Sequence, residues 1–269
     1  NAIKNSNINL EGSIMYVTLE PCNHYGQTPP CTKEIIKNKI SEIIYSIEDV
    51  DKKIKGKSFK ILKSNNLIVK KGLLKKEIIN FYKPYFFNRN NKMPYVTGKI
   101  AVSKNNLIYS KGTIKITDVH SDKLTHFLRY KNDSLMISYK TLNVDNPKLD
   151  CRLEGLSKFS PKRIILDNNL KMNINSYIFR TATKINTVVF YKKAEKFKIS
   201  IFKKKGIQLI KSNLLKNEDF DIKLILKKLY SLGCRNLLVE GGNDLSKSII
   251  KNKLFNQFYL FKSPKKLSK

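Results

Sequence analysis

The sequence predicts an α/β protein of two domains. Strand-like runs alternate with helical segments along the whole chain, which is typical of βαβ units around a parallel sheet. At 269 residues the chain is long for one core, because domains average roughly 150 residues. Hydrophobic residues make up 41% of the chain, which is enough for two cores. The rhythm restarts after a polar stretch near Asn91. We therefore expect one domain over 1–91 and a second over 92–269.

The first domain is expected to alternate three strands with helices. β-Branched and aromatic residues mark its strands, and apolar spacing marks its helices. The predicted strands are 13–19, 43–47 and 67–69, and the predicted helices are 32–39, one ending near 62, and 81–91. Thr32 is expected to cap the first of these helices. A loop broken by Gly26, Pro29 and Pro30 precedes it.

The second domain repeats the same alternation. The predicted strands are 94–101, 134–137, 163–167, 186–190, 236–240 and 258–261, and the predicted helices are 118–130, 222–232 and one starting near Asp244. A polar loop is expected over 143–152. No apolar run approaches the roughly 20 residues that a membrane-spanning helix needs, so we expect no membrane partner.

The charge of the chain is strongly positive. Lys and Arg number 53 against 21 Asp and Glu, a formal net charge of +32. Such a charge suggests a polyanionic partner. However, the lysines are spread singly or in short pairs along the whole length, which indicates solvated surfaces more than a nucleic-acid-binding arm. The basic field would still attract a phosphorylated small molecule.

The stretch from Thr18 to Cys31 carries the clearest chemistry. Cys22 and Cys31 flank a loop shaped by proline and glycine, and Cys31 opens a helix. Two thiolates so placed suit Zn²⁺, and a catalytic zinc needs a third protein ligand and an open position for water. Zinc deaminases use such a Pro-Cys and a later Cys together with an upstream His-x-Glu.

This stretch resembles the deaminase domain of the bifunctional riboflavin-biosynthesis deaminase/reductase family. The resemblance implies a partial cytidine-deaminase-like αβα domain, with Cys22 and Cys31 as zinc ligands and His24 lining the substrate pocket. In the family the zinc His and the general acid/base Glu precede the segment that matches Asn1, so we expect a piece of a longer protein that does not deaminate by itself. Gln27 stands where the family usually has a basic residue.

The second domain carries a weaker signal of its own. The run Val239–Leu245 is a strand that ends in Glu240 and two glycines before a helix, where backbone N–H groups could bind a phosphate. A Rossmann G-x-G-x-x-G is not present in the sequence, so the two glycines alone indicate only a turn. Arg129 and Arg152 could each make bidentate contacts with a phosphate.

Together these motifs resemble the reductase domain of the same family, a dihydrofolate-reductase-like α/β domain that uses NADPH. The resemblance implies that Glu240 and Lys99 act at the reacting centre. It assigns substrate contacts to Thr113, Arg129, Leu149, Arg152 and Glu240. It assigns cofactor contacts to Val102, Lys115, Thr141, Asp145, Asn168, Gly242, Asn243, Asp244, Leu245, Ser246, Lys247 and Ser248.

Two departures from the family concern the cofactor. Asn105 and Asn106 replace an Asp-Gly turn after Ser103, and Lys115 stands at the position of a Trp that stacks on the cofactor. A cation cannot stack on nicotinamide as an indole does, although it could pair with a phosphate of NADP. Both departures bear on cofactor affinity more than on fold.

The resemblance implies a bifunctional enzyme of riboflavin biosynthesis, a zinc hydrolase and NADP-dependent oxidoreductase. Its substrates would be phosphorylated pyrimidines, first deaminated and then reduced at the sugar. Two alternatives stay open: a stand-alone reductase with a degenerate deaminase half, and a basic nucleic-acid-binding protein on a deaminase-like fold. Four cysteines in a chain of this length do not indicate a disulfide scaffold, so a cytoplasmic location is expected. A homo-oligomer is compatible with the sequence.

Overall fold

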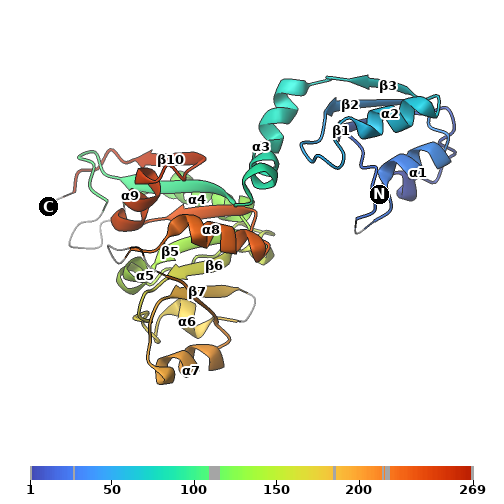
Figure 1. Cartoon of the computed structure of the whole chain (residues 1–269). Helices are drawn as coiled ribbons and strands as arrows, with labels where there is room; N and C mark the ends of the chain where they lie inside the picture. The colour runs from blue at the N-terminus through green and yellow to red at the C-terminus, as the bar shows by residue number, and fades with distance from the viewer. Residues whose placement is uncertain are drawn as a thin grey trace. The chain divides into compact units, whose positions relative to one another are not determined.

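The computed structural model describes residues 2–26, 28–108, 116–183, 186–213, 215 and 219–267. The chain divides into two compact units, Asn1–Asn91 and Lys92–Lys269, each with its own parallel sheet (Figure 1). The expected α/β class with parallel strands is confirmed. Within the described ranges, no helix combines the length and the apolar character that crossing a membrane requires.

Unit 1 is built on a three-stranded sheet in the order β1-β2-β3. Its elements are η1 Ile3–Asn5, β1 Ile14–Leu19, α1 Cys31–Lys37, β2 Glu42–Ile47, α2 Lys57–Ser64, β3 Ile68–Lys71 and α3 Lys75–Asn91. Alternate residues of β2 point to one face, where Ile43 and Tyr45 are fully buried. They pack with Ile35 of α1 and Leu62 of α2. Helices α1 and α2 therefore cover the same face of the sheet, and the ends of the strands are left to form sites.

Unit 2 contains a seven-stranded sheet in the order β10-β4-β9-β5-β6-β7-β8, with every pair parallel. Its strands are β4 Tyr95–Val102, β5 Ser134–Ser138, β6 Lys162–Leu166, β7 Thr187–Tyr191, β8 Gln208–Lys211, β9 Asn236–Glu240 and β10 Gln257–Lys262. Its helices are α4 Val119–Lys131, α5 Tyr139–Asp145, η2 Ser157–Phe159, α6 Tyr177–Arg180, α7 Lys196–Lys204, α8 Ile222–Ser231 and α9 Asn243–Lys251. The inner strands β5, β6 and β7 are apolar and almost wholly buried, as expected where helices cover both faces of a parallel sheet.

The first strand of unit 2 lies between its last two. β4 pairs with β9 on one side and with β10 on the other. Gly98 makes the second pairing possible, because a Cβ there would lie 2.4 Å from Phe258 and 2.7 Å from Phe255. A side chain at this position would collide with both rings.

Two local predictions were wrong. Thr32 is not the cap of the first helix: α1 begins one residue earlier, at Cys31, and Thr32 is buried inside it. The expected loop over 143–152 begins inside α5, which is capped by Ser138 and includes Thr141 and Asp145. Ser138 accepts the backbone N–H of Thr141, which satisfies one free donor of the first turn. This cap fixes where Thr141 lies.

Candidate functional site

The two cysteines of unit 1 lie together at the end of β1. Cys31 is the first residue of α1, and its backbone N–H donates to Cys22 Sγ at 3.3 Å. The two Sγ atoms are also 3.3 Å apart. The backbone N–H of Thr32 donates to the carbonyl of Cys22, which holds the loop against the helix. Burial, and then the neighbouring Cys22, raise the pKa of the Cys31 thiol. A cation between the sulfurs would reverse that effect.

The thiol pair fits part of a zinc site. Both sulfurs are on one short loop and can reach a single ion, as tetrahedral zinc sites require. Among the described residues, no group of three or more His, Cys, Asp or Glu could hold a metal. The described part of the chain thus offers two ligands, one fewer than a catalytic zinc takes from its protein.

Glu20, which no sequence motif singled out, anchors the cysteine loop. Its carboxylate is 3% exposed and accepts backbone N–H groups of Asp49, Gly56 and Ser58 at 3.0 to 3.3 Å. Ser58 in turn donates its hydroxyl to the carbonyl of Pro21 at 2.6 Å. These bonds tie the segment after β2 to the residues just before Cys22. In the sequence, only the Glu-Pro pair that precedes Cys22 could have pointed to it.

A cavity of ≈ 370 Å³ adjoins the thiols and is lined by Cys22, Cys31, Glu20 and Asp49 among others. His24 lies in the same loop, and its Nδ1 is buried without a hydrogen-bond partner in the described part of the chain. Asn23 Oδ1 is in the same condition. Buried polar atoms are normally paired, so both atoms are open to a bond from a ligand. Neither His24 nor Asn23 is among the described residues that line the cavity, so the contact of His24 with the substrate pocket stays a prediction. Gln27 lies outside the described residues.

The polar centre of unit 2 joins Glu240, Arg129 and Lys99. Glu240 ends β9 and lies in register with Lys99 of β4. Arg129, from the last turns of α4, donates Nε and Nη2 to the two carboxylate oxygens of Glu240, both at 2.7 Å. Its Nη1 donates to the carbonyl of Asp150 at 3.1 Å. The side chains of this ion pair are 11% and 12% exposed, so the structure brings together three residues predicted for the site.

Electrostatics differ among these groups. Burial alone would lower the pKa of Arg129, but the hydrogen bonds and charge of Glu240 outweigh it and raise the pKa above its ordinary value. Burial lowers the pKa of Lys99, against the opposing charge of Glu240. The Lys99 ammonium also lies 5.0 Å from the centre of the Phe261 ring. A lysine whose pKa is lowered in this way gives up a proton more readily.

Leu149 and Arg152 belong to one segment but differ in burial. Leu149 is 2% exposed and belongs to the core of unit 2, so its side chain presents almost no surface to a ligand. The Arg152 side chain is 50% exposed and pairs with Asp150. The backbone N–H of Arg152 donates to His126 Nδ1 at 3.2 Å, a contact that no sequence motif indicated. His126 therefore holds the Asp150–Arg152 segment against α4.

The turn between β9 and α9 is shaped for close backbone approach. Gly242 has φ 70°, and a Cβ there would lie 2.9 Å from Thr141 Oγ1. Gly242 precedes α9 without a side-chain cap, so the first N–H groups of that helix remain available to an anion. Asp244, in the first turn, pairs with Lys140 at 2.9 Å. The turn fits the phosphate of a dinucleotide.

Only some of the residues predicted to contact the cofactor line a common cavity. A cavity of ≈ 210 Å³ at the carboxyl ends of β5 and β6 is lined by Asn168, Asp244, Leu245 and Ser248. The remaining α9 residues are Asn243, Ser246 and Lys247, of which Ser246 donates to the carbonyl of Gly241. Asp145 is exposed at the end of α5, and Val102 is buried at the end of β4, outside that cavity. Thr113 and Lys115 lie outside the described residues.

Comparison with known proteins identifies the relatives of the chain. The model of the RibD C-terminal domain matches residues 94–267, well over half of the chain. The chain belongs to the RibD family. The cytidine and deoxycytidylate deaminase zinc-binding region matches residues 1–47, which include both cysteines.

Individual RibD proteins agree with this assignment along nearly the whole chain. The riboflavin biosynthesis protein RibD of Aquifex aeolicus is 33% identical over 257 residues, covering 95% of this chain and 70% of the relative. A Thermotoga maritima structure described as a diaminohydroxyphosphoribosylaminopyrimidine deaminase/5-amino-6-(5-phosphoribosylamino)uracil reductase aligns with a TM-score of 0.80 at 25% identity, over 97% of this chain and 70% of that one. Acinetobacter baumannii RibD shares the fold, with a TM-score of 0.82 at 22% identity over 97% of this chain and 71% of that one.

Proposed function

We propose that unit 2 reduces 5-amino-6-(5-phosphoribosylamino)uracil with NADPH in riboflavin biosynthesis. We further propose that unit 1 contributes Cys22 and Cys31 to the preceding zinc-dependent deamination of the diaminopyrimidine. Membership of the RibD family supports both assignments. The observation that carries the first is the cluster of Glu240, Arg129 and Lys99 beside the Gly242 turn.

The reductase step needs a carbon–nitrogen bond of the opened sugar held against a hydride donor. NADPH, when bound, supplies the hydride. In this proposal the half-buried ammonium of Lys99, the β4 residue in register with Glu240, donates the proton, and its lowered pKa favours that transfer. Glu240 would accept hydrogen bonds from substrate hydroxyl or amine groups through lone pairs that Arg129 does not occupy.

Arg129 and Arg152 take different roles in the proposal. Arg129 directs three of its N–H groups at Glu240 and Asp150, so we assign it to holding Glu240 in place. Arg152 is half exposed and is the better anchor for the substrate phosphate. This shifts the phosphate contact, first expected from both arginines, towards Arg152.

In unit 1 the proposal extends to the two ligands that the described residues supply. Zn²⁺, when bound, would supply a water acidic enough to attack the pyrimidine ring. Cys22 and Cys31 would hold the ion, and Glu20 would fix the loop that presents them. The free thiols support a reducing, cytoplasmic compartment as part of the proposal.

Oxidation of NADPH by the purified protein tests the proposal. With the phosphoribosylamino-uracil as substrate, the absorbance of the reduced nicotinamide should fall. Glu240→Gln should reduce kcat by about 10²-fold or more, because a positioned polar group at the reacting centre typically contributes this much. Arg152→Ala should raise KM with little change in kcat, because the phosphate lies away from the reacting bond. A wild-type protein that leaves NADPH unoxidised would overturn the assignment of unit 2.

The net charge of +32 left open that the chain is a nucleic-acid-binding protein. Membership of the RibD family favours the enzyme over that alternative. A salt titration separates the two. A nucleic-acid-binding protein would lose affinity for DNA or RNA steeply with salt, in proportion to the phosphates that it neutralises.

A further inference from the structure

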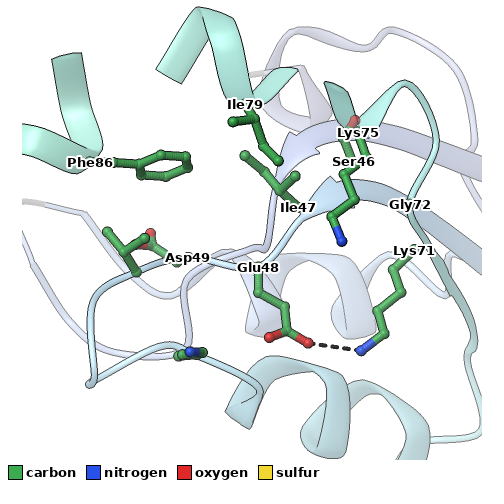
Figure 2. Close-up of a pocket in the computed structure, with 11 residues that line it drawn as sticks. Ser46, Ile47, Glu48, Asp49, Lys71, Gly72, Lys75, Ile79 and Phe86 are labelled. Atoms are coloured by element: carbon green, nitrogen blue, oxygen red, sulfur yellow. Dashed lines mark hydrogen bonds and ion pairs between the residues drawn. The ribbon is translucent and has the colours of Figure 1, made fainter. Parts of the chain in front are cut away.

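A second cavity of unit 1 lies at the carboxyl ends of β2 and β3, and no predicted site residue lines it. Its volume is ≈ 550 Å³, within the range of small-molecule sites. Ile47 belongs to β2, and Ile79 and Phe86 project from α3 to form an apolar wall (Figure 2). Ligands of open α/β sheets bind at this edge, outside the carboxyl ends of parallel strands. We call this cavity the lysine pocket.

The rim of the lysine pocket is positive. Lys55, Lys71 and Lys75 line it together with Glu48 and Asp49. Lys71 pairs with Glu48 at 2.8 Å, as Figure 2 shows. Among the described residues, neither Lys55 nor Lys75 has a carboxylate within ion-pair distance. Two ammonium groups are therefore left to receive an anion.

Asp49 does not cancel this charge at the rim, because its carboxylate is engaged elsewhere. It is 3% exposed, accepts the Tyr85 hydroxyl at 3.1 and 3.2 Å, and accepts the backbone N–H of Asp51 at 2.8 Å. The hydrogen bond from Lys71, followed by the charges of Lys71, Lys55 and Lys75, lowers the pKa of Glu48. The positive charges of these lysines would therefore stabilise a carboxylate or phosphate bound in the pocket.

The lysine pocket adjoins the cysteine cavity. Asp49 lines both, and the backbone N–H of Asp49 donates to Glu20, which also lines the cysteine cavity. A ligand that reaches past Asp49 would have one end near the thiols and the other among the lysines. The two cavities together suit an elongated molecule with a polar ring and an anionic tail.

We propose that the lysine pocket binds the ribose phosphate end of the phosphorylated pyrimidine, whose ring occupies the cysteine cavity. This inference rests on the proposed function and names a substrate contact for unit 1. Compact ammonium groups bind phosphate as point charges, and the walls of Ile79 and Phe86 complement the C–H face of a sugar. Lys55 and Lys75 are the residues on which recognition of the phosphate depends.

A fluorescent reporter tests the pocket without interference from unit 2. The chain contains no Trp, so Phe86→Trp places its single indole in the pocket wall. Ribose 5-phosphate is the probe, and ribose and inorganic phosphate are the comparison ligands. The charge-reversal variant is K55E/K75E on this background. The matched control is K37E/K60E, which changes the same charge on exposed helical lysines outside the pocket.

The expected result is a saturable change in emission with ribose 5-phosphate. K55E/K75E should weaken binding by roughly tenfold or more, because two attractive charges become repulsive, and K37E/K60E should leave it near the reporter value. Ribose should give no response, and inorganic phosphate should bind more weakly than the sugar phosphate. Equal weakening by both charge variants, or no saturable response, would overturn the proposal.

Hydrogen exchange gives a second readout that needs no substitution. Ribose 5-phosphate should slow exchange in residues 46–50 and 71–79 of the wild-type chain. Slower exchange confined to unit 2 would contradict the pocket while leaving the reductase assignment intact. NADPH oxidation, measured separately, fails only if the proposed reductase function fails.

Discussion

At the scale of single residues, the decisive feature of unit 2 is a nearly buried charge pair. Arg129 and Glu240 have little access to water, so each depends on the other for its hydrogen bonds. Removing one partner leaves the other charge buried and unpaired. Arg152, which carries the same side chain on the surface, provides the natural comparison.

Arg129→Ala should lower the free energy of unfolding of unit 2 by about 3–5 kcal/mol, the usual result of breaking a buried ion pair. Arg152→Ala should lower it by less than about 1 kcal/mol, because exposed pairs contribute little. Urea denaturation followed by circular dichroism measures both. Equal destabilisation by the two substitutions would show that the Arg129 pair is not buried in solution.

His126 should make stability depend on pH in a definite direction. Burial, followed by the charges of Arg129 and Arg152, lowers the pKa of His126 below the usual 6.5. Just below that pH the unfolded chain binds a proton that the folded chain does not, so stability is lost as the pH falls. His126→Asn retains an acceptor for the Arg152 N–H but removes the titration. The stability advantage of wild type over His126→Asn should therefore shrink between pH values of about 7.5 and about 5.5. An advantage that is constant across that range would contradict this assignment.

At the scale of elements, the contact between β4 and the β10 segment depends on a missing side chain. Gly98→Ala would place a methyl group against Phe255 and Phe258, and overpacking of this kind costs about 1–3 kcal/mol. We expect faster hydrogen exchange in β10, which lies at the edge of the sheet. Gly26→Ala is the control, because a Cβ at Gly26 would have nothing within 4 Å and the φ of Gly26 is not in the left-handed region. Unchanged exchange in Gly98→Ala would show that the aromatic rings move aside at little cost.

The sequence predicted most strands but missed elements whose signal is local and weak. β5, β6 and β9 are short apolar runs bounded by polar residues, which sequence patterns show well. α5 has only seven residues, and Thr141, Asn143 and Val144 among them have low helix propensity. The helix is stabilised instead by the Ser138 cap and by the packing of Leu142 in the core. α6, α7 and β8 were likewise not predicted. Propensity is too weak to reveal elements of this length.

The candidate sites were predictable only where the partners are close in sequence. Cys22 and Cys31 are nine positions apart, and the loop between them was enough to predict the pair from the sequence. Arg129 and Glu240 were each predicted as site residues. Their ion pair was not predicted, because it forms only when the fold brings α4 next to the end of β9. Glu20 and His126 bind backbone N–H groups, and such contacts leave no characteristic residue pattern. These are the residues that only the structure could identify.

At the scale of the whole molecule, the proposed function assigns zinc binding to unit 1 and NADPH-dependent reduction to unit 2. C22S/C31S should weaken zinc retention by roughly tenfold or more, because both thiolate ligands become hydroxyls that ionise far less readily. NADPH oxidation should remain within about twofold of wild type, because the residues proposed for the reductase site, Glu240, Arg129 and Lys99, all lie in unit 2. Metal analysis after dialysis and a parallel NADPH assay measure the two effects. A matching loss of NADPH oxidation would show that the units are coupled.

The position of β4 between β9 and β10 has a consequence for synthesis on the ribosome. β4 emerges first in unit 2, yet its neighbours are the last strands to emerge, and sequence-distant pairings of this kind form slowly. Until then β4 has exposed backbone groups on both edges, which invite pairing with other chains. A nascent chain stalled before Asn236 would therefore be the species most in need of a chaperone.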